Sequence, residues 1–146
     1  MIKNIPNKFT KELLLKIIDQ NFKKAYDLFI LPSDVNGYKN FGYAFINFIY
    51  SYYIPYFYFL FNGKKWGSTN SKKICEITYS NIQGRNNLLS HYSDKIIFLN
   101  EEAKNYDADL KFIIPNDYKN IFKEAFPNCN IEEYKYYFVT KMPFNL

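Results

Sequence analysis

The segment 41–48, Phe-Gly-Tyr-Ala-Phe-Ile-Asn-Phe, constrains the fold more than any other part of the chain. Its aromatic and β-branched residues favour a strand. Because side chains alternate across a strand, Tyr43, Phe45 and Asn47 share one face, and the intervening apolar residues share the other. The apolar face can pack against helices. The segment therefore predicts an inner strand of a sheet that is covered on one face and presents two exposed aromatic rings on the other.

The same segment fits a known signature, the inner-strand RNP1 pattern of the RNA recognition motif, at seven of its eight positions if Ile stands for Val. The departure is Phe41, where the pattern has Lys or Arg, so a usual phosphate contact is in doubt there. Upstream, residues 1–6 fit the partner-strand RNP2 pattern, with Met1 at its usual aromatic position. On this pattern we expect the chain to begin inside its first strand, which residues before Met1 would complete. The alternative is a buried aromatic strand with a chance Gly42.

Periodicity along residues 1–99 predicts the order β-α-β-β-α-β. Strands are expected at 2–5, 26–31, 41–48 and 74–80, and helices at 11–19 and 54–61, with Thr10 as the N-cap of the first. The apolar stripe of that first helix is expected to be Leu13, Leu14, Ile17 and Ile18. This order predicts an α+β, ferredoxin-like fold with a four-stranded antiparallel sheet, whose free face is available for a ligand.

The chain is expected to hold one such domain, residues 1–99, including a helix at 83–92 after the fourth strand and a short apolar extension at 95–99. Residues 100–146 are expected to form an α-rich C-terminal extension that packs on or beside the domain. Within it, the pattern suggests a strand at 111–114 and a helix at 117–126, whereas 134–140 fits either.

Charge and composition narrow the function classes. The chain carries a net charge of +5, but residues 1–95 hold thirteen Lys or Arg against six acids and residues 96–146 hold six against eight. The basic part coincides with the RNP patterns, which favours a polyanionic partner, although ordinary solvated lysines explain many of these charges equally well. The high aromatic content is discounted, because Asn, Lys, Ile, Tyr and Phe are all abundant here.

Several classes are disfavoured. Cys75 and Cys129 are far apart and His91 is the only histidine, so no metal site and no cofactor are expected. The uncharged run 44–61 contains polar residues and Pro55, so we expect a strand and a buried helix there, not a membrane span. No phosphate-cradling glycine loop or nucleophile pattern occurs, so we expect no enzyme activity. The absence of a signal peptide predicts an intracellular protein, nuclear or cytoplasmic.

The chain also resembles one branch of this motif family. Over residues 1–92 it is similar to the C-terminal RNA recognition motif of the Mei-two-like meiosis-regulating RNA-binding proteins. The resemblance is carried by segments 1–10, 26–27 with 31–32, 42–47, 61–66 and 82–84. It implies single-stranded RNA binding in a regulator of meiosis or sexual development, without catalysis and without a preference for duplex DNA. Residues 100–146 fall outside it.

The resemblance implies site residues as well. Tyr43 and Phe45 would stack bases, with Met1 as a third platform, while Lys3 and Asn47 would contact base edges or phosphate. Further candidates for basic or polar contacts are Lys39, Lys72, Lys73 and Arg85. Tyr79 would extend the platform or belong to the core. The helix after Gly84 would bring Arg85 and His91 to the RNA, or it would simply cap the core.

A second function remains open on the same fold. Some members of this superfamily bind Trp-containing peptides through a loop after the second helix, where this chain has Lys64, Lys65 and Trp66. In that alternative the partner is a protein. In the RNA-binding alternative, Trp66 is a packing residue at the rim of the domain.

Overall fold

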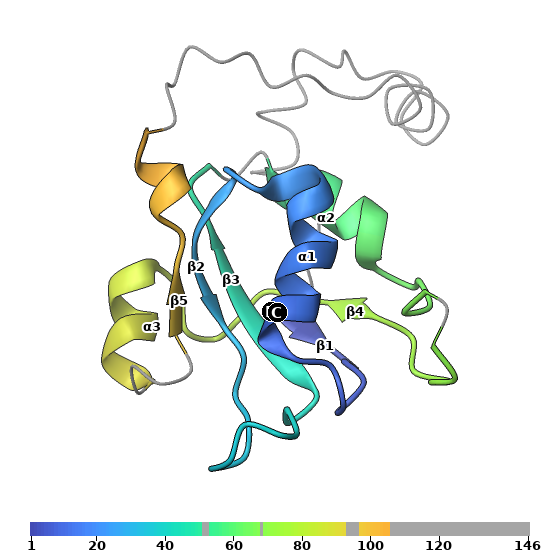
Figure 1. Cartoon of the computed structure of the whole chain (residues 1–146). Coiled ribbons are helices and arrows are strands. Elements are labelled where there is room, and N and C mark those ends of the chain that lie inside the picture. The colour runs from blue at the N-terminus through green and yellow to red at the C-terminus, as the bar shows by residue number, and fades with distance from the viewer. Residues whose placement is uncertain (51–52, 68, 93–96, 106–146) are drawn as a thin grey trace, which may run out of the picture.

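The computed structural model describes residues 1–50, 53–67, 69–92 and 97–105. They form a five-stranded antiparallel sheet in the order β4-β1-β3-β2-β5 (Figure 1). The strands are β1 (Ile2–Lys3), β2 (Tyr26–Ile30), β3 (Tyr43–Phe48), β4 (Glu76–Ile77) and β5 (Ile97–Leu99). The helices are α1 (Lys11–Phe22), α2 (Tyr53–Phe61) and α3 (Arg85–His91), followed by the 3-10 helix η2 (Glu101–Asn105).

The predicted α+β, ferredoxin-like fold is confirmed, with one strand more than expected. The apolar extension at 95–99 contributes β5, which pairs with β2 through Leu28↔Leu99, Phe29↔Phe98 and Ile30↔Ile97. The fourth strand is shorter than predicted, because only Glu76 and Ile77 of the expected segment 74–80 pair as a strand. The elements expected at 111–114, 117–126 and 134–140 lie outside the described residues.

The first helix begins as predicted. The Thr10 hydroxyl accepts a hydrogen bond from the Leu13 backbone N–H at 3.2 Å, which satisfies a donor that the first turn leaves free. The predicted apolar stripe is wrong by part of a turn. Leu13 is 41% exposed, and the residues that α1 buries are Leu14, Leu15, Ile18 and Phe22. Phe22 lies four residues beyond Ile18, so the stripe follows the helical period through the C-terminal turn.

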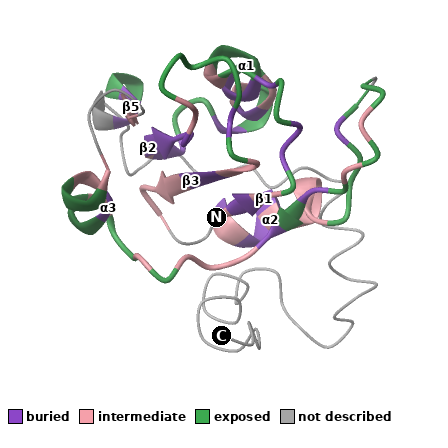
Figure 2. Ribbon diagram, turned by 90° about the horizontal axis from the view of Figure 1, so that it is seen from below, coloured by how far each residue is buried: buried purple, intermediate pink, exposed green. Residues whose placement is uncertain are grey.

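The main core lies between the sheet and the helices α1 and α2. Phe22 of α1 is its centre and is 1% exposed. Its ring packs against Tyr56 at a centroid distance of 5.3 Å, Phe57 at 5.2 Å and Phe48 of β3 at 5.8 Å. The α2 helix therefore docks through aromatic side chains onto α1 and β3. Figure 2 shows α1 on one side of β2 and β3, and α3 on the other side.

A bulge in β2 determines which side chains reach each face. The pairing with β3 shifts between Tyr26 and Leu28, so Asp27 is the additional residue. As a result, Tyr26 and Phe29 both belong to the main core, although they are an odd number of positions apart. Leu28 and Ile30 point to the opposite face. The bulge thus places the Asp27 carboxylate beside that second face.

Within the described ranges, none of the helices has the length and apolar character needed to cross a bilayer. The same part of the chain contains no group of three or more His, Cys, Asp or Glu side chains placed to hold a metal ion.

Cys75 provides a test of this packing. Its side chain is 2% exposed, and burial, with a smaller effect from Glu76, raises the thiol pKa from 9.0 to about 12. Because only the thiolate reacts with iodoacetamide, this rise in pKa strongly lowers the reactive fraction of the thiol at neutral pH. We expect Cys75 to stay unmodified in native protein and to react rapidly in urea, as read by peptide mass spectrometry. Equal rates in both conditions would contradict the buried position.

Candidate nucleic-acid interface

The sheet face that carries the RNP patterns has one open end. Lys3 of β1 lies directly between Tyr43 of β3 and Glu76 of β4 in the sheet register, so the three side chains form a row on this face. Lys3 Nζ is 3.2 Å from Glu76 Oε1, and both side chains are partly exposed. Tyr43 is half-buried. This row therefore offers solvent an aromatic ring, an ammonium group and a carboxylate.

The expectation that Phe45 is exposed is wrong. Its side chain is 6% exposed and forms a second apolar cluster with Leu28, Ile30 and Leu88. The Tyr92 ring follows α3 and lies 5.2 Å from the Phe45 ring, centroid to centroid. Apolar side chains of β2, β3 and α3 thus bury one another, and the Phe45 ring is removed from solvent.

Tyr43 remains in contact with this cluster. Its ring meets the Phe45 ring edge to face, with centroids 5.8 Å apart and planes at 82°. Burial, with a smaller effect from Tyr43, raises the pKa of Tyr92, so the two phenols lie near each other. Phe45 therefore supports the edge of Tyr43, while Tyr92 closes off the Phe45 ring itself.

An ionic contact reinforces the position of α3. Arg85 Nε lies 3.5 Å from Asp27 Oδ2, and Asn47 Nδ2 donates a hydrogen bond of 2.8 Å to Asp27 Oδ1. Arg85 and Asn47, both predicted to contact RNA, are thus joined through the Asp27 carboxylate, which the bulge in β2 places here. Sequence reasoning missed Asp27, because its side chain reaches this face only through a bulge that no residue pattern marks.

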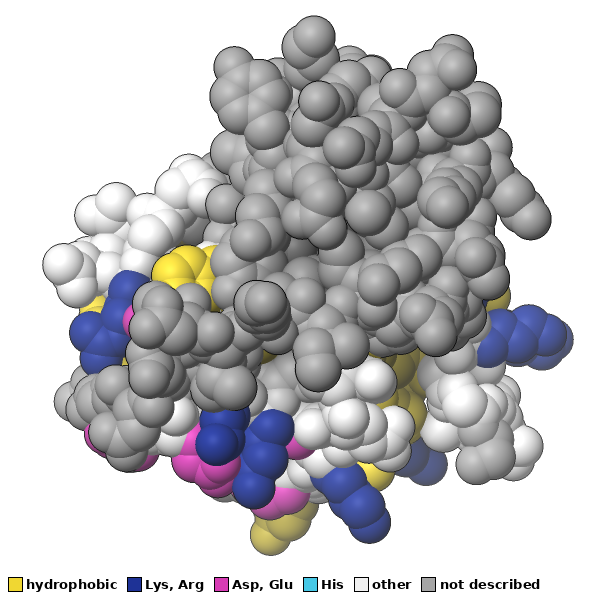
Figure 3. Space-filling view, turned by 90° about the horizontal axis from the view of Figure 1, so that it is seen from above, with side chains coloured by type: hydrophobic (Ala, Val, Ile, Leu, Met, Phe, Trp, Pro, Cys, Tyr) yellow, Lys and Arg dark blue, Asp and Glu magenta, His cyan; other side chains and the backbone are white. Residues whose placement is uncertain are grey.

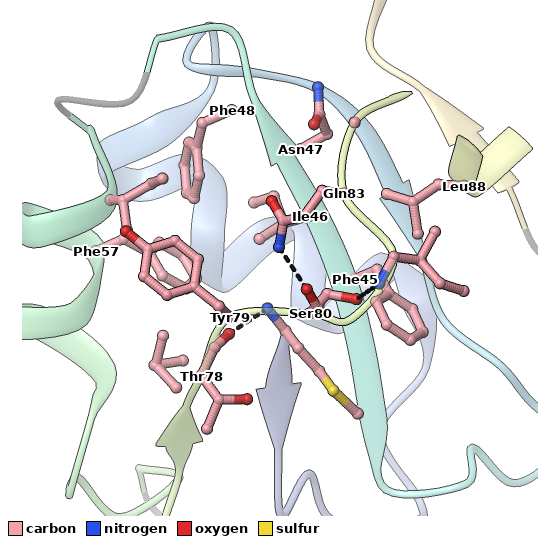
Figure 4. A pocket seen from close by; sticks show the side chains of 15 residues that line it. Phe45, Ile46, Asn47, Phe48, Phe57, Thr78, Tyr79, Ser80, Gln83 and Leu88 are labelled. Carbon is pink, nitrogen blue, oxygen red and sulfur yellow. Dashed lines mark hydrogen bonds between the residues drawn. The ribbon is translucent and has the colours of Figure 1, made fainter. Parts of the chain in front are cut away.

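The remaining predicted platform residues border a cavity of about 300 Å³ (Figure 4). Met1 lines it and packs against the Phe45 cluster, and its amino group donates a 2.8 Å hydrogen bond to the Thr78 carbonyl. Tyr79 lines the cavity and is half-buried. It was predicted to lie on the fourth strand, but β4 ends at Ile77 and Tyr79 follows it. His91 is exposed, with its ring 4.9 Å from that of Tyr92.

Two asparagines join the loops at one end of the sheet. The Asn40 side chain is 2% exposed; its Nδ2 donates to the carbonyls of Pro6 at 2.8 Å and Phe9 at 2.9 Å, and its Oδ1 accepts from the Gly42 N–H at 2.7 Å. The Asn7 Nδ2 in turn donates to the Asn40 carbonyl at 2.9 Å. Gly42 has a φ of 89°, which favours glycine in this signature position.

The predicted lysines differ in how they are held. Lys73 Nζ donates to the Ile5 carbonyl at 3.0 Å and to Asn7 Oδ1 at 2.8 Å. Lys39 is exposed in the loop between β2 and β3. Both line an open groove of about 1050 Å³ at the loop end of the sheet, together with Lys8 and Phe41. Lys72 is exposed and does not line this groove.

Trp66 belongs to the core and not to the rim. It is 7% exposed, its ring packs edge to face on Phe9 at 5.7 Å, and its indole Nε1 donates to the Asn4 carbonyl at 2.8 Å. Asn4 has a φ of 58°, a left-handed conformation that Asn tolerates better than most residues. The Asn-Ile-Pro-Asn and Lys-Lys-Trp blocks therefore meet in space to close the main core, which leaves no exposed tryptophan for a peptide-binding loop.

The part of the chain that carries these strands and helices is similar to known proteins. The family model described as RNA recognition motif 2 matches residues 1–93. The protein named MEI2-like 2 from Oryza sativa subsp. japonica is 48% identical over 104 residues, which cover 71% of this chain and 12% of that protein. MEI2-like 1 from Arabidopsis thaliana is 45% identical over 104 residues, covering 71% of this chain and 11% of that protein. The chain thus spans about a tenth of the length of the curated relatives it matches.

Proposed function

Because this chain belongs to the RNA recognition motif 2 family, we propose that it binds single-stranded RNA on the outer face of its sheet. Its similarity to MEI2-like proteins, which confirms the resemblance found in the sequence, supports a place in a regulator of meiosis or development. We also propose an intracellular location, which an RNA partner supports. The domain acts by binding, and its chemistry is stacking and charge neutralisation rather than catalysis.

The row of Tyr43, Lys3 and Glu76 carries this proposal. An unpaired base can stack on the exposed side of the Tyr43 ring, and such contacts contribute about 1–3 kcal/mol each. Lys3 is the register partner of Tyr43, and its ammonium can exchange its partly exposed Glu76 partner for a phosphate, because a surface ion pair is worth only about 0–1 kcal/mol. Tyr43 thus provides the base contact and Lys3 provides the backbone contact.

Phe45 has a different role in this proposal from the one its position in the signature implies. With Tyr92 5.2 Å away and only 6% of the side chain exposed, its ring is not accessible to a base. It holds Tyr43 by an edge contact instead. The accessible platform therefore begins at Tyr43 and extends toward the loop end of the sheet, away from α3.

A Tyr43→Ala substitution tests the proposal. We expect it to weaken binding of a fluorescein-labelled oligouridine by about 1–3 kcal/mol, measured by fluorescence anisotropy. Tyr38→Ala is the matched control, because it removes the same side chain from a 79% exposed position in the loop between β2 and β3. The proposal fails if the unmodified protein does not bind RNA, or if both variants bind equally well.

A further inference from the structure

The groove at the loop end of the sheet combines charge with an exposed aromatic ring. Three loops form it: the one between β1 and α1, the one between β2 and β3, and the one between α2 and β4. They lie together at the lower end of the molecule in Figure 1. Lys8, Lys39 and Lys73 line the groove against a single acid, Asp34. Phe41, which replaces the usual Lys or Arg of the signature, lines it too and is 57% exposed.

Lys73 is fixed in place and still has capacity to bind. Its ammonium has three donors, and two of them go to the Ile5 carbonyl and Asn7 Oδ1. Both acceptors are uncharged, so they orient the ammonium without neutralising it. None of the three groove lysines forms an ion pair with a carboxylate in the described part of the chain. The groove therefore keeps its positive charge.

The position of Lys73 relative to the signature is informative. A Cβ built on Gly42 would lie 3.8 Å from Lys73 Nζ, so the ammonium sits beside the residue that follows Phe41. The signature normally has a Lys or Arg at the position of Phe41, and this chain has no charge there. Lys73, from the loop before β4, supplies an ammonium group at this place instead.

We infer that this groove binds the sugar-phosphate backbone of the RNA strand beyond Tyr43, with Lys73 contacting a phosphate and the Phe41 ring stacking a base. The inference rests on the proposed RNA-binding function and extends that site. Phe41 is two residues before Tyr43, so at most about 7 Å separates their Cα atoms and one RNA strand can reach both rings. Lys39 and Lys8 continue the positive charge along the groove.

Lys and Arg side chains are placed differently on the visible part of the opposite end of the molecule. Figure 3 views that end, and its visible Lys and Arg side chains are dispersed, some of them against Asp or Glu side chains. Lys23, in contrast to the groove lysines, forms an ion pair: its Nζ lies 3.2 Å from Glu102 Oε1. An exposed aromatic ring beside lysines that have no carboxylate partner among the described residues fits a strand that carries both bases and phosphates, whereas a purely acidic peptide would leave Phe41 without a stacking partner.

The test compares Lys73→Gln with Lys16→Gln, which removes the same charge from an exposed position of α1 outside the groove. Binding of a four-nucleotide and a ten-nucleotide oligouridine is measured by anisotropy over a range of salt concentrations. For the longer RNA, we expect Lys73→Gln to lower the slope of log affinity against log salt by roughly 0.7 and the affinity at 0.1 M salt roughly fivefold. The shorter RNA, which covers only the sheet, should bind both variants like the unmodified protein.

Two further variants keep the test independent of folding. Lys73→Arg should retain most of the affinity for the longer RNA. Phe41→Ala should lower that affinity roughly five- to a hundredfold. Val35→Ala, at an exposed position in the same loop, should leave it unchanged. If the unmodified protein binds neither RNA, the proposed function itself fails. If it binds both, and Lys73→Gln and Phe41→Ala match their controls, only this inference is overturned. Equal competition by a decaglutamate peptide would also overturn the assignment to RNA.

Discussion

Replacing Phe45 by alanine should lower the free energy of unfolding by about 3–5 kcal/mol, the usual cost of removing a buried phenylalanine ring. The ring is 6% exposed and connects β2, β3 and α3 through Leu28, Ile30 and Leu88. For a domain of about 100 residues, in which each kcal/mol shifts Tm by roughly 4 °C or more, the loss corresponds to a fall in Tm of at least about 12 °C. Urea unfolding monitored by circular dichroism would measure it.

Tyr43→Ala is the control for this effect, because the neighbouring ring is half-buried and packs at the edge of the same cluster. We expect its cost to be well below that of Phe45→Ala, and Phe45→Leu to recover much of the lost stability. If Phe45→Ala instead left stability unchanged and abolished RNA binding, Phe45 would be an open stacking platform, and the packing of Tyr92 and α3 over it would be wrong.

Asn40→Ala should destabilise the domain by a similar amount, about 3–5 kcal/mol. The substitution leaves the Phe9 carbonyl and the Gly42 N–H without their side-chain partner, and each unsatisfied buried group costs about 1–3 kcal/mol. It also removes one of the two donors to the Pro6 carbonyl, which keeps the hydrogen bond from the Phe9 N–H. Chemical denaturation would measure the loss. Asn36→Ala, at an exposed position in the same loop, should change the stability by less than about 0.5 kcal/mol.

Asn40→Asp separates hydrogen bonding from side-chain volume. The carboxylate has nearly the same shape, but at neutral pH it cannot donate to the Pro6 and Phe9 carbonyls and would face them with a negative charge. We expect it to be at least as destabilising as Asn40→Ala. A nearly unperturbed Asn40→Asp protein would show that the amide network does not hold these loops together.

The sequence predicted those parts of the fold that depend on local periodicity. Alternation in 41–48 identified β3 and its two faces, and Thr10 identified the start of α1. The failures have a common cause in tertiary contacts. Leu13 and Leu15 are equally apolar, and only the docking of α1 on the sheet decides that Leu15 is the buried one.

The candidate site shows the same limit. Alternation correctly placed Phe45 on the face opposite the main helices, but it contains no information about a later helix that returns to cover that face. Leu88 and Tyr92 do this from about forty residues downstream. The Asn40 network was equally hidden, because an asparagine in a turn-rich loop usually serves its own turn, whereas this one satisfies the backbone of a different loop.

The Asn40 hydrogen bonds also affect the rate at which RNA can bind in the groove and the conformational entropy that is lost when it does. Loops normally lose conformational freedom when they close on a ligand, and that entropy is subtracted from the binding energy. Here a buried amide already fixes the loop before α1 to the loop before β3, and Asn7 fixes the Lys73 ammonium to both. A strand of RNA therefore meets a groove whose backbone is set in advance. Its encounter rate should be governed by electrostatic attraction and diffusion, not by the time that loops need to rearrange.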